Sequence, residues 1–252
     1  MYKFSIAPSD FLAPDFEDKL RLCERTGCAY VELNDIVGGL FLGSMSGEDI
    51  EFMRNLLIDY GKTISLVTYT GAVSDTERFK KLLRTAHLLR VKAIKVDCSG
   101  YDSMEALIAD VNTLASFAFC YGIELCIENL HDSILAKNAD LEKLIKGIEK
   151  PVKVIFNPLA FAYMRAHPFF HEFYGSKLKN RIEFLRINDG LYCERRPTMP
   201  ACGNAEIKEL ASILLSRSFD GYFSFTDYFG GKMSESELLE VITAIRALLK
   251  QM

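Results

Sequence analysis

The stretch AIKVDCSGYDSMEALIADVNTLASFAFCYGIELCIEN, residues 93–129, contains a complete strand–helix–strand unit. The runs at 93–98 and 124–129 are short and apolar at alternate positions, which is typical of strands. The segment 103–122 between them has the length and apolar spacing of a helix, and it ends at a glycine. A helix that connects two such strands predicts a parallel sheet.

The same unit recurs along the whole chain of 252 residues. Further strands are predicted at 3–7, 30–34, 64–69, 152–157, 182–188 and 222–227. Further helices are predicted at 15–27, 47–61, 74–90, 138–148, 204–217 and 234–252, with a helical region interrupted at Pro168 after the sixth strand. The helix at 74–90 is expected to begin at Ser74, with Glu77 completing a capping box. Eight such units in a chain of this length predict a single α/β domain over residues 1–252, a (β/α)8 TIM barrel.

An open, doubly wound sheet is the alternative arrangement of alternating strands and helices. That fold normally carries a glycine-rich phosphate loop directly after its first strand. The corresponding stretch here, IAPSDFLAPD at 6–15, contains no glycine. The closed barrel is therefore the favoured prediction.

The composition narrows the classes of function. The net charge is −4 and the sequence pI is about 5.7, which disfavours a nucleic-acid partner. No apolar run has the length of a membrane span, and the N-terminal residues enter a strand pattern without a signal peptide. Seven cysteines, an odd number scattered along the chain, indicate reduced thiols, expected as small core residues. We therefore expect a cytoplasmic protein with no membrane partner.

Several strands carry a polar residue where strand alternation directs the side chain toward the barrel axis. An example is the stretch EFLRINDG, residues 183–190, in which the guanidinium of Arg186 is expected to point inward. A buried charge is costly unless it is paired or used. The predicted inward polar set is Glu32, Lys95, Asp97, Glu128, Asn157, Arg186 and Thr226. All lie near the C-terminal ends of their strands, where barrel enzymes place their active sites.

The order and spacing of several motifs resemble those of a known family. The motifs are YVELND (30–35), ELCIENL (124–130), FNPLAFAYMRAHP (156–168), FLRINDG (184–190), PACGNAEI (200–207) and DGYFSFTDY (220–228). Over essentially its whole length the chain resembles the xylose isomerase-like barrels, the sugar and sugar-phosphate isomerases and epimerases related to apurinic endonucleases. The resemblance implies the (β/α)8 fold and an isomerase or epimerase activity.

The family resemblance also implies a metal held by Glu, Asp, His and Glu from strands five to eight. The matching positions here are Glu128, Asn157, Arg186 and Thr226. Only Glu128 fits, because a guanidinium stays protonated and offers no lone pair. The metal site is therefore expected to be degenerate, with no metal bound. If a divalent cation such as Mg or Mn binds, we expect it on Glu128, Asn157 and Asp97.

These positions lead to a hypothesis for the site. Glu128 is expected to act as a general base, with Arg186 supplying the positive charge in place of the metal-binding His. Lys95 and Asp97 complete the catalytic candidates. The candidates for substrate binding are Glu32, Asn129, His131, Asn157, Asp189 and Thr226. The expected substrate is a small carbohydrate or sugar acid.

Other interpretations stay open at the level of sequence. One is a non-catalytic or degenerate carbohydrate-binding barrel, and another is a metal enzyme with the shifted site. A third is an enzyme that forms a Schiff base between Lys95 and its substrate. DNA repair is disfavoured, because the chain has few histidines to bind zinc. Arg195 and Arg196 would add positive charge in the loop after the seventh strand. Aromatic and apolar residues at 36–43 and 169–175 are candidates for contact with a second copy of the chain or for closing over the barrel.

Overall fold

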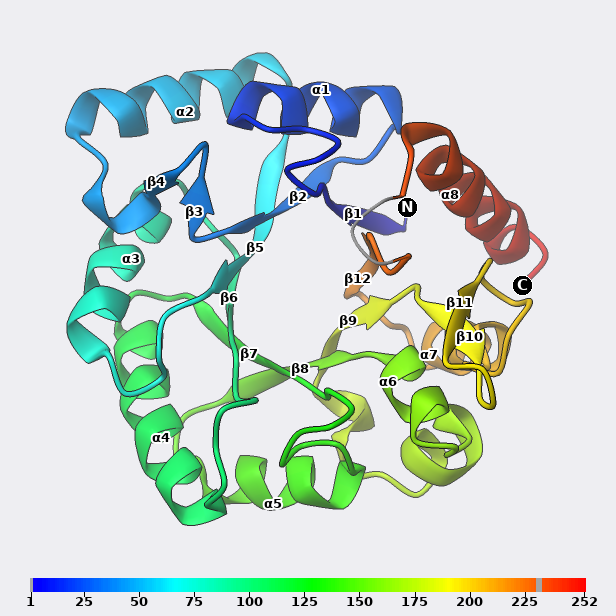
Figure 1. Cartoon of the computed structure of the whole chain (residues 1–252). Coiled ribbons are helices and arrows are strands. Elements are labelled where there is room, and N and C mark those ends of the chain that lie inside the picture. Colours follow the sequence, from blue (N-terminus) through cyan, green and yellow to red (C-terminus); the bar gives the residue numbers. More distant parts are fainter. Residues whose placement is uncertain (1, 230–232) are drawn as a thin grey trace.

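Eight parallel strands form a closed barrel at the centre of the molecule (Figure 1). The computed structural model describes residues 2–229 and 233–252. The barrel strands are β1 (Lys3–Ala7), β2 (Tyr30–Asn34), β5 (Thr63–Tyr69), β6 (Ala93–Val96), β7 (Glu124–Glu128), β8 (Val152–Phe156), β9 (Ile182–Arg186) and β12 (Tyr222–Thr226). Neighbours along the chain pair with each other, and β1 pairs with β12 to close the ring. The predicted (β/α)8 barrel is confirmed.

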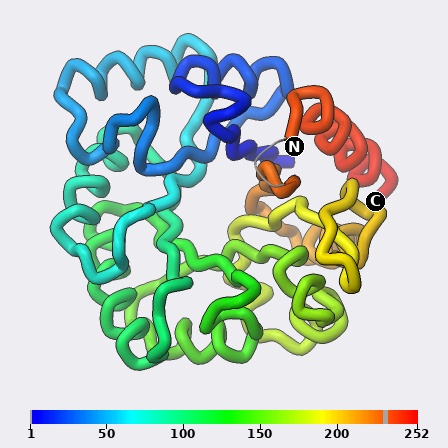
Figure 2. Tube along the Cα trace, in the orientation of Figure 1, coloured from blue at the N-terminus to red at the C-terminus, as the bar shows by residue number. Residues whose placement is uncertain are grey.

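Helices surround the barrel and connect each strand to the next. They are α1 (Phe16–Arg25), α2 (Gly47–Asp59), α3 (Thr76–Leu88), α4 (Met104–Cys120), α5 (Asn138–Gly147), α6 (Pro158–Tyr163), α7 (Ile207–Ser216) and α8 (Glu235–Leu249). Figure 2 shows the chain winding once around the ring, so that the first and last units lie side by side. Every strand therefore delivers its C-terminal end to the same mouth of the barrel.

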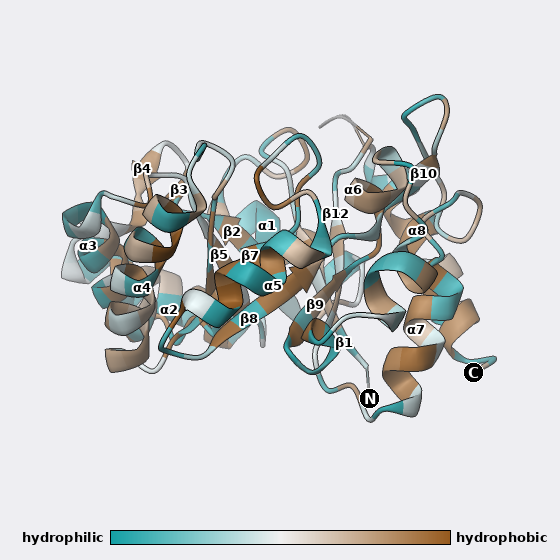
Figure 3. Ribbon diagram, turned by 90° about the horizontal axis from the view of Figure 1, so that it is seen from below, coloured by the Kyte–Doolittle hydropathy of each residue, from teal (hydrophilic) through white to brown (hydrophobic). Residues whose placement is uncertain are grey.

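The hydrophobic core has two parts. The larger part lies between the strands and the helices, and Figure 3 shows these hydrophobic strands within the helical ring. The smaller part lies inside the barrel, away from the mouth. We call it the apolar layer: Leu66, Ala93, Cys126, Ile155, Phe184 and Tyr222, with Tyr30 packed against them. This layer closes the barrel interior below the polar residues at the mouth.

Several short elements are not visible in the sequence pattern. Two antiparallel hairpins follow β2 and β9, and the region after β8 is divided into α6 and two further turns. These elements are β3 (Ile36–Val37), β4 (Leu40–Phe41), η1 (Leu42–Ser44), the π-helix η2 (Pro168–Tyr174), η3 (Leu178–Asn180), β10 (Asp189–Leu191) and β11 (Arg196–Thr198). The expected cap of the third helix is wrong: Asp75, not Ser74, accepts from the Arg78 amide, at 3.0 Å.

All seven cysteines are free. Four are buried as expected, but Cys120, Cys193 and Cys202 are exposed, so the expectation of core thiols is wrong for these three. Cys120 is the last residue of α4 and is not among the buried residues of that helix. No helix in the described part of the chain combines the length and the hydrophobicity that crossing a bilayer requires.

The two candidate contact segments each expose apolar side chains. In the first, Ile36 and Leu40 of the β3–β4 hairpin are each 41% exposed. In the second, Phe170 and Tyr174 of η2 are about two-thirds exposed, whereas Phe173 of the same segment is buried. Contact with a second copy of the chain stays a prediction for both segments.

Candidate functional site

Arg186, the last residue of β9, lies at the centre of a buried ion network at the barrel mouth. Its Nη1 donates to Glu32 Oε2 at 2.5 Å and to the hydroxyl of Ser224. Its Nε and Nη2 each lie 3.3 Å from an oxygen of Glu128. The guanidinium is therefore held between two carboxylates from opposite sides of the barrel, and their charges raise its pKa despite burial. The inward orientation predicted for Arg186 is confirmed.

Glu128, the last residue of β7, accepts from three side chains. Besides Arg186, it accepts from Lys95 Nζ at 2.9 Å and from Asn157 Nδ2 at 2.9 Å. Burial alone would raise the pKa of Glu128, but the charges and hydrogen bonds of Arg186 and Lys95 lower it to about 2. Glu128 is thus a carboxylate at neutral pH, and in this arrangement a weak base.

Lys95 is the charged member of the network that reaches toward solvent. Its side chain is 18% exposed, whereas those of Glu128 and Arg186 are almost fully buried. An ammonium has three N–H donors, and Glu128 is the one hydrogen-bond acceptor for Lys95 within residues 2–229 and 233–252. Lys95 therefore retains donors for a bound molecule at the mouth.

Asn129 and Asn157 fix the two neighbouring strand ends. Asn129 Nδ2 donates to the carbonyl of Asn157 at 2.8 Å, and the Asn157 amide donates to Asn129 Oδ1 at 2.7 Å. This reciprocal pair locks the Asn157 backbone and aims its side-chain amide at Glu128. Asn129 is fully buried, so it acts on the site through Asn157.

Four candidates lie outside the network: Asp97, Thr226, Asp189 and His131. Asp97, the residue after β6, is exposed and accepts from the Ser99 amide at 2.9 Å. Thr226 donates to Asn188 Oδ1 at 2.9 Å. Among the described residues, neither side chain is a hydrogen-bond partner of Glu128, whose partners are Lys95, Asn157 and Arg186.

Asp189 is fully buried and serves the loop after β9. It accepts from the backbone amides of Gly190, Gly203 and Ala205, at 2.7–3.0 Å. Burial raises its pKa, against the lowering effect of these bonds. Its buried side chain holds the β10–β11 hairpin in position, and a role in substrate binding stays a prediction.

His131 lies on the rim formed by the loop after β7. Its ring packs edge-on against Tyr163, with 5.4 Å between ring centroids, and its Nε2 lies 3.9 Å from the carboxylate of Asp132. Arg195 from the β10–β11 loop lies 3.5 Å from the same carboxylate. His131 and Arg195 therefore border the mouth but do not touch Glu128. Arg196 is an exposed partner of Glu194.

Ser224 of β12 is a network member absent from the predicted site. Its hydroxyl accepts from Arg186 and donates to Glu32. Alternation along β12 already places it on the inward face, two residues before Thr226. Strand alternation therefore indicated that Ser224 faces inward, but a serine hydroxyl suggests a functional role less directly than a charged side chain does.

A divalent cation does not fit the donor set of the described residues. Arg186 fills the centre of the site with positive charge, and the other implied ligand positions supply one carboxylate, one amide and one hydroxyl. No residue in the described ranges donates to the buried Oδ1 of Asn157, but a single amide oxygen is not a cation site. Within the described ranges, no three His, Cys, Asp or Glu residues are arranged to hold a metal.

One family model matches this chain. It describes the xylose isomerase-like TIM barrel and aligns with residues 20–248. Among curated proteins, none matches.

Similar solved structures cover nearly all of the chain. A xylose isomerase domain containing protein from Salmonella typhimurium has 21% identity and a TM-score of 0.75, over 99% of this chain and 97% of that one. A probable 3-DHS dehydratase from Bacillus anthracis has 14% identity and a TM-score of 0.78, over 97% and 98%. A D-psicose 3-epimerase has 15% identity and a TM-score of 0.74, over 98% and 99%. At these identities the likeness shows the fold alone.

Proposed function

Because the chain belongs to the xylose isomerase-like TIM barrel family, we propose that it is an isomerase or epimerase-type enzyme for a small carbohydrate or sugar acid. The observation that carries the proposal is the ionised carboxylate of Glu128, held at the mouth between Arg186 and the partly exposed Lys95. A carboxylate beside a cation with free donors is the pair of groups that enolisation requires.

In the proposed reaction, Glu128 removes a proton from the carbon next to the substrate carbonyl. The C–H electron pair forms a carbon–carbon double bond, and the carbonyl electrons move onto its oxygen. Lys95 donates a hydrogen bond to that oxygen and stabilises the developing negative charge. If Glu128 returns the proton to the former carbonyl carbon, and the hydroxyl proton of the deprotonated carbon passes to the former carbonyl oxygen, the product is an isomer. An epimer forms instead when a water molecule on the opposite face donates a proton to the deprotonated carbon and Glu128 later releases its own proton to solvent.

The low pKa of Glu128 is compatible with this role if the substrate draws Lys95 away. The carboxylate has a pKa of about 2 while both cations contact it. A substrate oxygen that takes over the Lys95 ammonium removes one of those contacts. The pKa of Glu128 then rises, and the carboxylate becomes a stronger base at the moment when the substrate is in place. Arg186 and Glu32 stay paired and hold the carboxylate in position.

The test is exchange of substrate C–H protons with solvent in D2O. The substrates are a panel of aldoses, ketoses and sugar acids. For each of them, NMR detects the replacement of hydrogen by deuterium on the carbon next to the carbonyl. Exchange is expected with the wild type and should fall by about 10²-fold or more in Glu128→Gln, which keeps the size of the side chain. Glu183→Gln is the matched control. Glu183 lies near the start of β9, away from the mouth, and its ion pair with Lys153 of β8 is lost in this variant. Exchange should be normal.

A chelation step tests the role of Arg186. We expect the exchange rate to be unchanged after treatment with EDTA, since the positive charge belongs to the chain. Loss of exchange on chelation, with recovery on adding Mg²⁺ or Mn²⁺, would support a shifted metal site instead.

A second candidate, a carbohydrate-binding barrel without turnover, is favoured by the saturation of Arg186. Four of its five N–H donors have partners in the network, so little remains for a transition state. Saturable binding of a sugar without any deuterium incorporation would select this function over the first.

A further inference from the structure

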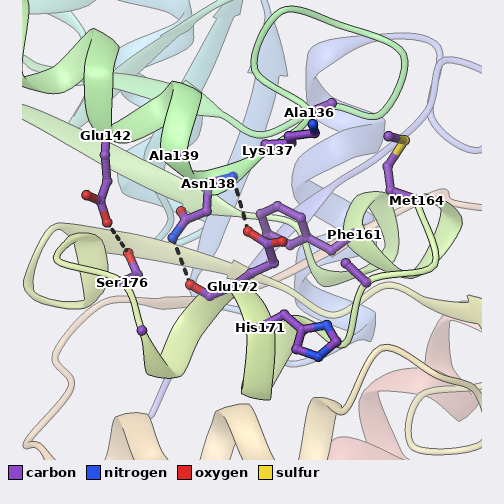
Figure 4. A pocket seen from close by; sticks show the side chains of 12 residues that line it. Ala136, Lys137, Asn138, Ala139, Glu142, Phe161, Met164, His171, Glu172 and Ser176 are labelled. Carbon is purple, nitrogen blue, oxygen red and sulfur yellow. Dashed lines mark hydrogen bonds between the residues drawn. The ribbon is translucent and has the colours of Figure 1, made fainter.

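A cavity lies on the flank of the barrel, between α5, α6 and η2 (Figure 4). Its volume is about 440 Å³, within the range of small-molecule sites. Phe161, Met164 and three alanines supply much of its lining. One wall is formed by η2, a seven-residue π-helix, a rare form that recurs at functional sites.

Glu172 of η2 places a half-buried carboxylate in this apolar cavity. Its Oε2 accepts from the backbone amide of Asn138 at 3.1 Å, at the first turn of α5. The described residues provide no hydrogen-bond partner for its second oxygen, Oε1, and no ion pair for its charge. Burial raises the pKa of Glu172, although His171 and Lys137 lower it from a distance. Oε1 therefore stays open to the cavity, and Lys137 and His171, which also line it, act on the charge without touching it.

The other carboxylate of the cavity, Glu142, is differently placed. It accepts from the Lys177 amide at 2.9 Å and from the Ser176 hydroxyl at 3.3 Å, and it pairs with Lys146 at 3.7 Å. Glu142 therefore already has its partners. Figure 4 shows the two carboxylates on separate sides of Asn138, with Glu172 next to Phe161.

Asn138 holds Glu172 in position. Its side-chain Nδ2 donates to the carbonyl of Glu172 at 2.7 Å, while its backbone amide donates to the Glu172 carboxylate. The residue is 6% exposed. Two bonds to one residue fix both the backbone and the side chain of Glu172, so the free oxygen has a defined place in the cavity.

We propose that this flank cavity binds a small organic cation, a primary ammonium on a short apolar chain, through the unpaired oxygen of Glu172. The ammonium supplies the charge and the donors that the carboxylate lacks. The chain fills the space between Phe161 and Met164 and removes apolar surface from water. Glu142 contributes little, because its oxygens are already engaged.

This proposal does not depend on the function proposed for the mouth, since binding is measured directly. The probe is propylammonium chloride, titrated into the 15N-labelled full chain while NMR follows the backbone amides of Asn138 and Ala139. Propan-1-ol and sodium propionate are the comparison ligands, of similar size but neutral or negative. We expect saturable shifts with propylammonium, with an affinity about tenfold or more above that of propanol.

Two variants locate the binding group. Glu172→Gln keeps an oxygen to accept from the Asn138 amide and should weaken propylammonium binding by about tenfold. Glu142→Gln is the matched control in the same cavity and should change the affinity by less than about threefold. Urea unfolding of both variants verifies that the fold is retained.

Three results would overturn the proposal. They are the absence of saturable shifts with propylammonium, equal affinity for propanol, and equal weakening by the two variants. None of these results bears on the deuterium exchange at the mouth.

Discussion

The apolar layer and the ion network occupy the same interior face of the same strands, yet they differ completely in chemistry. Two residues along a strand, a rise of about 6.6 Å, separate one from the other. The pairs are Tyr30 and Glu32, Ala93 and Lys95, Cys126 and Glu128, Ile155 and Asn157, Phe184 and Arg186, and Tyr222 and Ser224. One step toward the mouth replaces close apolar packing with charges and hydrogen bonds.

The comparison separates the residues that stabilise the barrel, in the apolar layer, from the residues that line its mouth, in the ion network. Burying apolar side chains stabilises the fold directly. Burying Glu32, Arg186 and Glu128 incurs a desolvation cost that their mutual attraction only roughly offsets. The ion network is therefore poorly explained by stability, which agrees with a role in binding or chemistry.

The largest expected effect comes from removing the central charge. Arg186→Met leaves Glu32 and Glu128 buried with only Lys95 for compensation, and should lower the free energy of unfolding by about 3–5 kcal/mol. Replacing the three charges together, with Glu32→Leu, Arg186→Met and Glu128→Leu, should recover most of that loss. Urea unfolding of both proteins measures the difference. A triple variant as unstable as the single one would mean that the ion network itself stabilises the barrel.

An intermediate effect is expected from pH. The pKa of Glu128 is about 2 in the fold, below its usual value of 4.5. Its ionised form therefore stabilises the fold above about pH 4.5, and this contribution is lost as pH falls toward 2. In urea unfolding across this pH range, the wild type should lose several kcal/mol more than Glu128→Gln. If the free energy of unfolding depended on pH in the same way in both proteins, the pKa of Glu128 would not be lowered by its partners in the network.

The smallest effect is expected in the apolar layer. Ile155→Val removes one methylene from a fully buried side chain and should lower the free energy of unfolding by about 1 kcal/mol. Solvent exchange of a substrate proton should be unaffected, because the change leaves every polar group of the ion network in place, although Ile155 lies beside Glu128 in the strand register. A loss of exchange in this variant would show that the two layers are mechanically coupled.

Strand periodicity was sufficient to predict the barrel and much of the ion network. Each strand alternates, so the inward direction of Glu32, Lys95, Glu128 and Arg186 follows from the apolar residues on either side. The chemical roles of these residues stay predictions. Asp97 does not join the network because its carboxylate accepts from the Ser99 amide in the loop after β6, a local contact that strand alternation does not predict.

The remaining features depend on contacts between distant segments. The burial of Asp189 arises from amides 14 and 16 residues later in the chain. The hairpins have strands of only two or three residues, too short for a periodic pattern. The flank cavity exists because η2 packs against the start of α5, a contact that no local pattern encodes.

Arg186 has one further consequence. A cation that is part of the polypeptide has no dissociation constant, so it is present in every folded molecule at one copy per site. Its amount follows the synthesis of the protein and not the supply of free ions in the surroundings. It also cannot be exchanged for a competing ion of higher affinity, which makes the charge at this position insensitive to metal starvation and to metal excess.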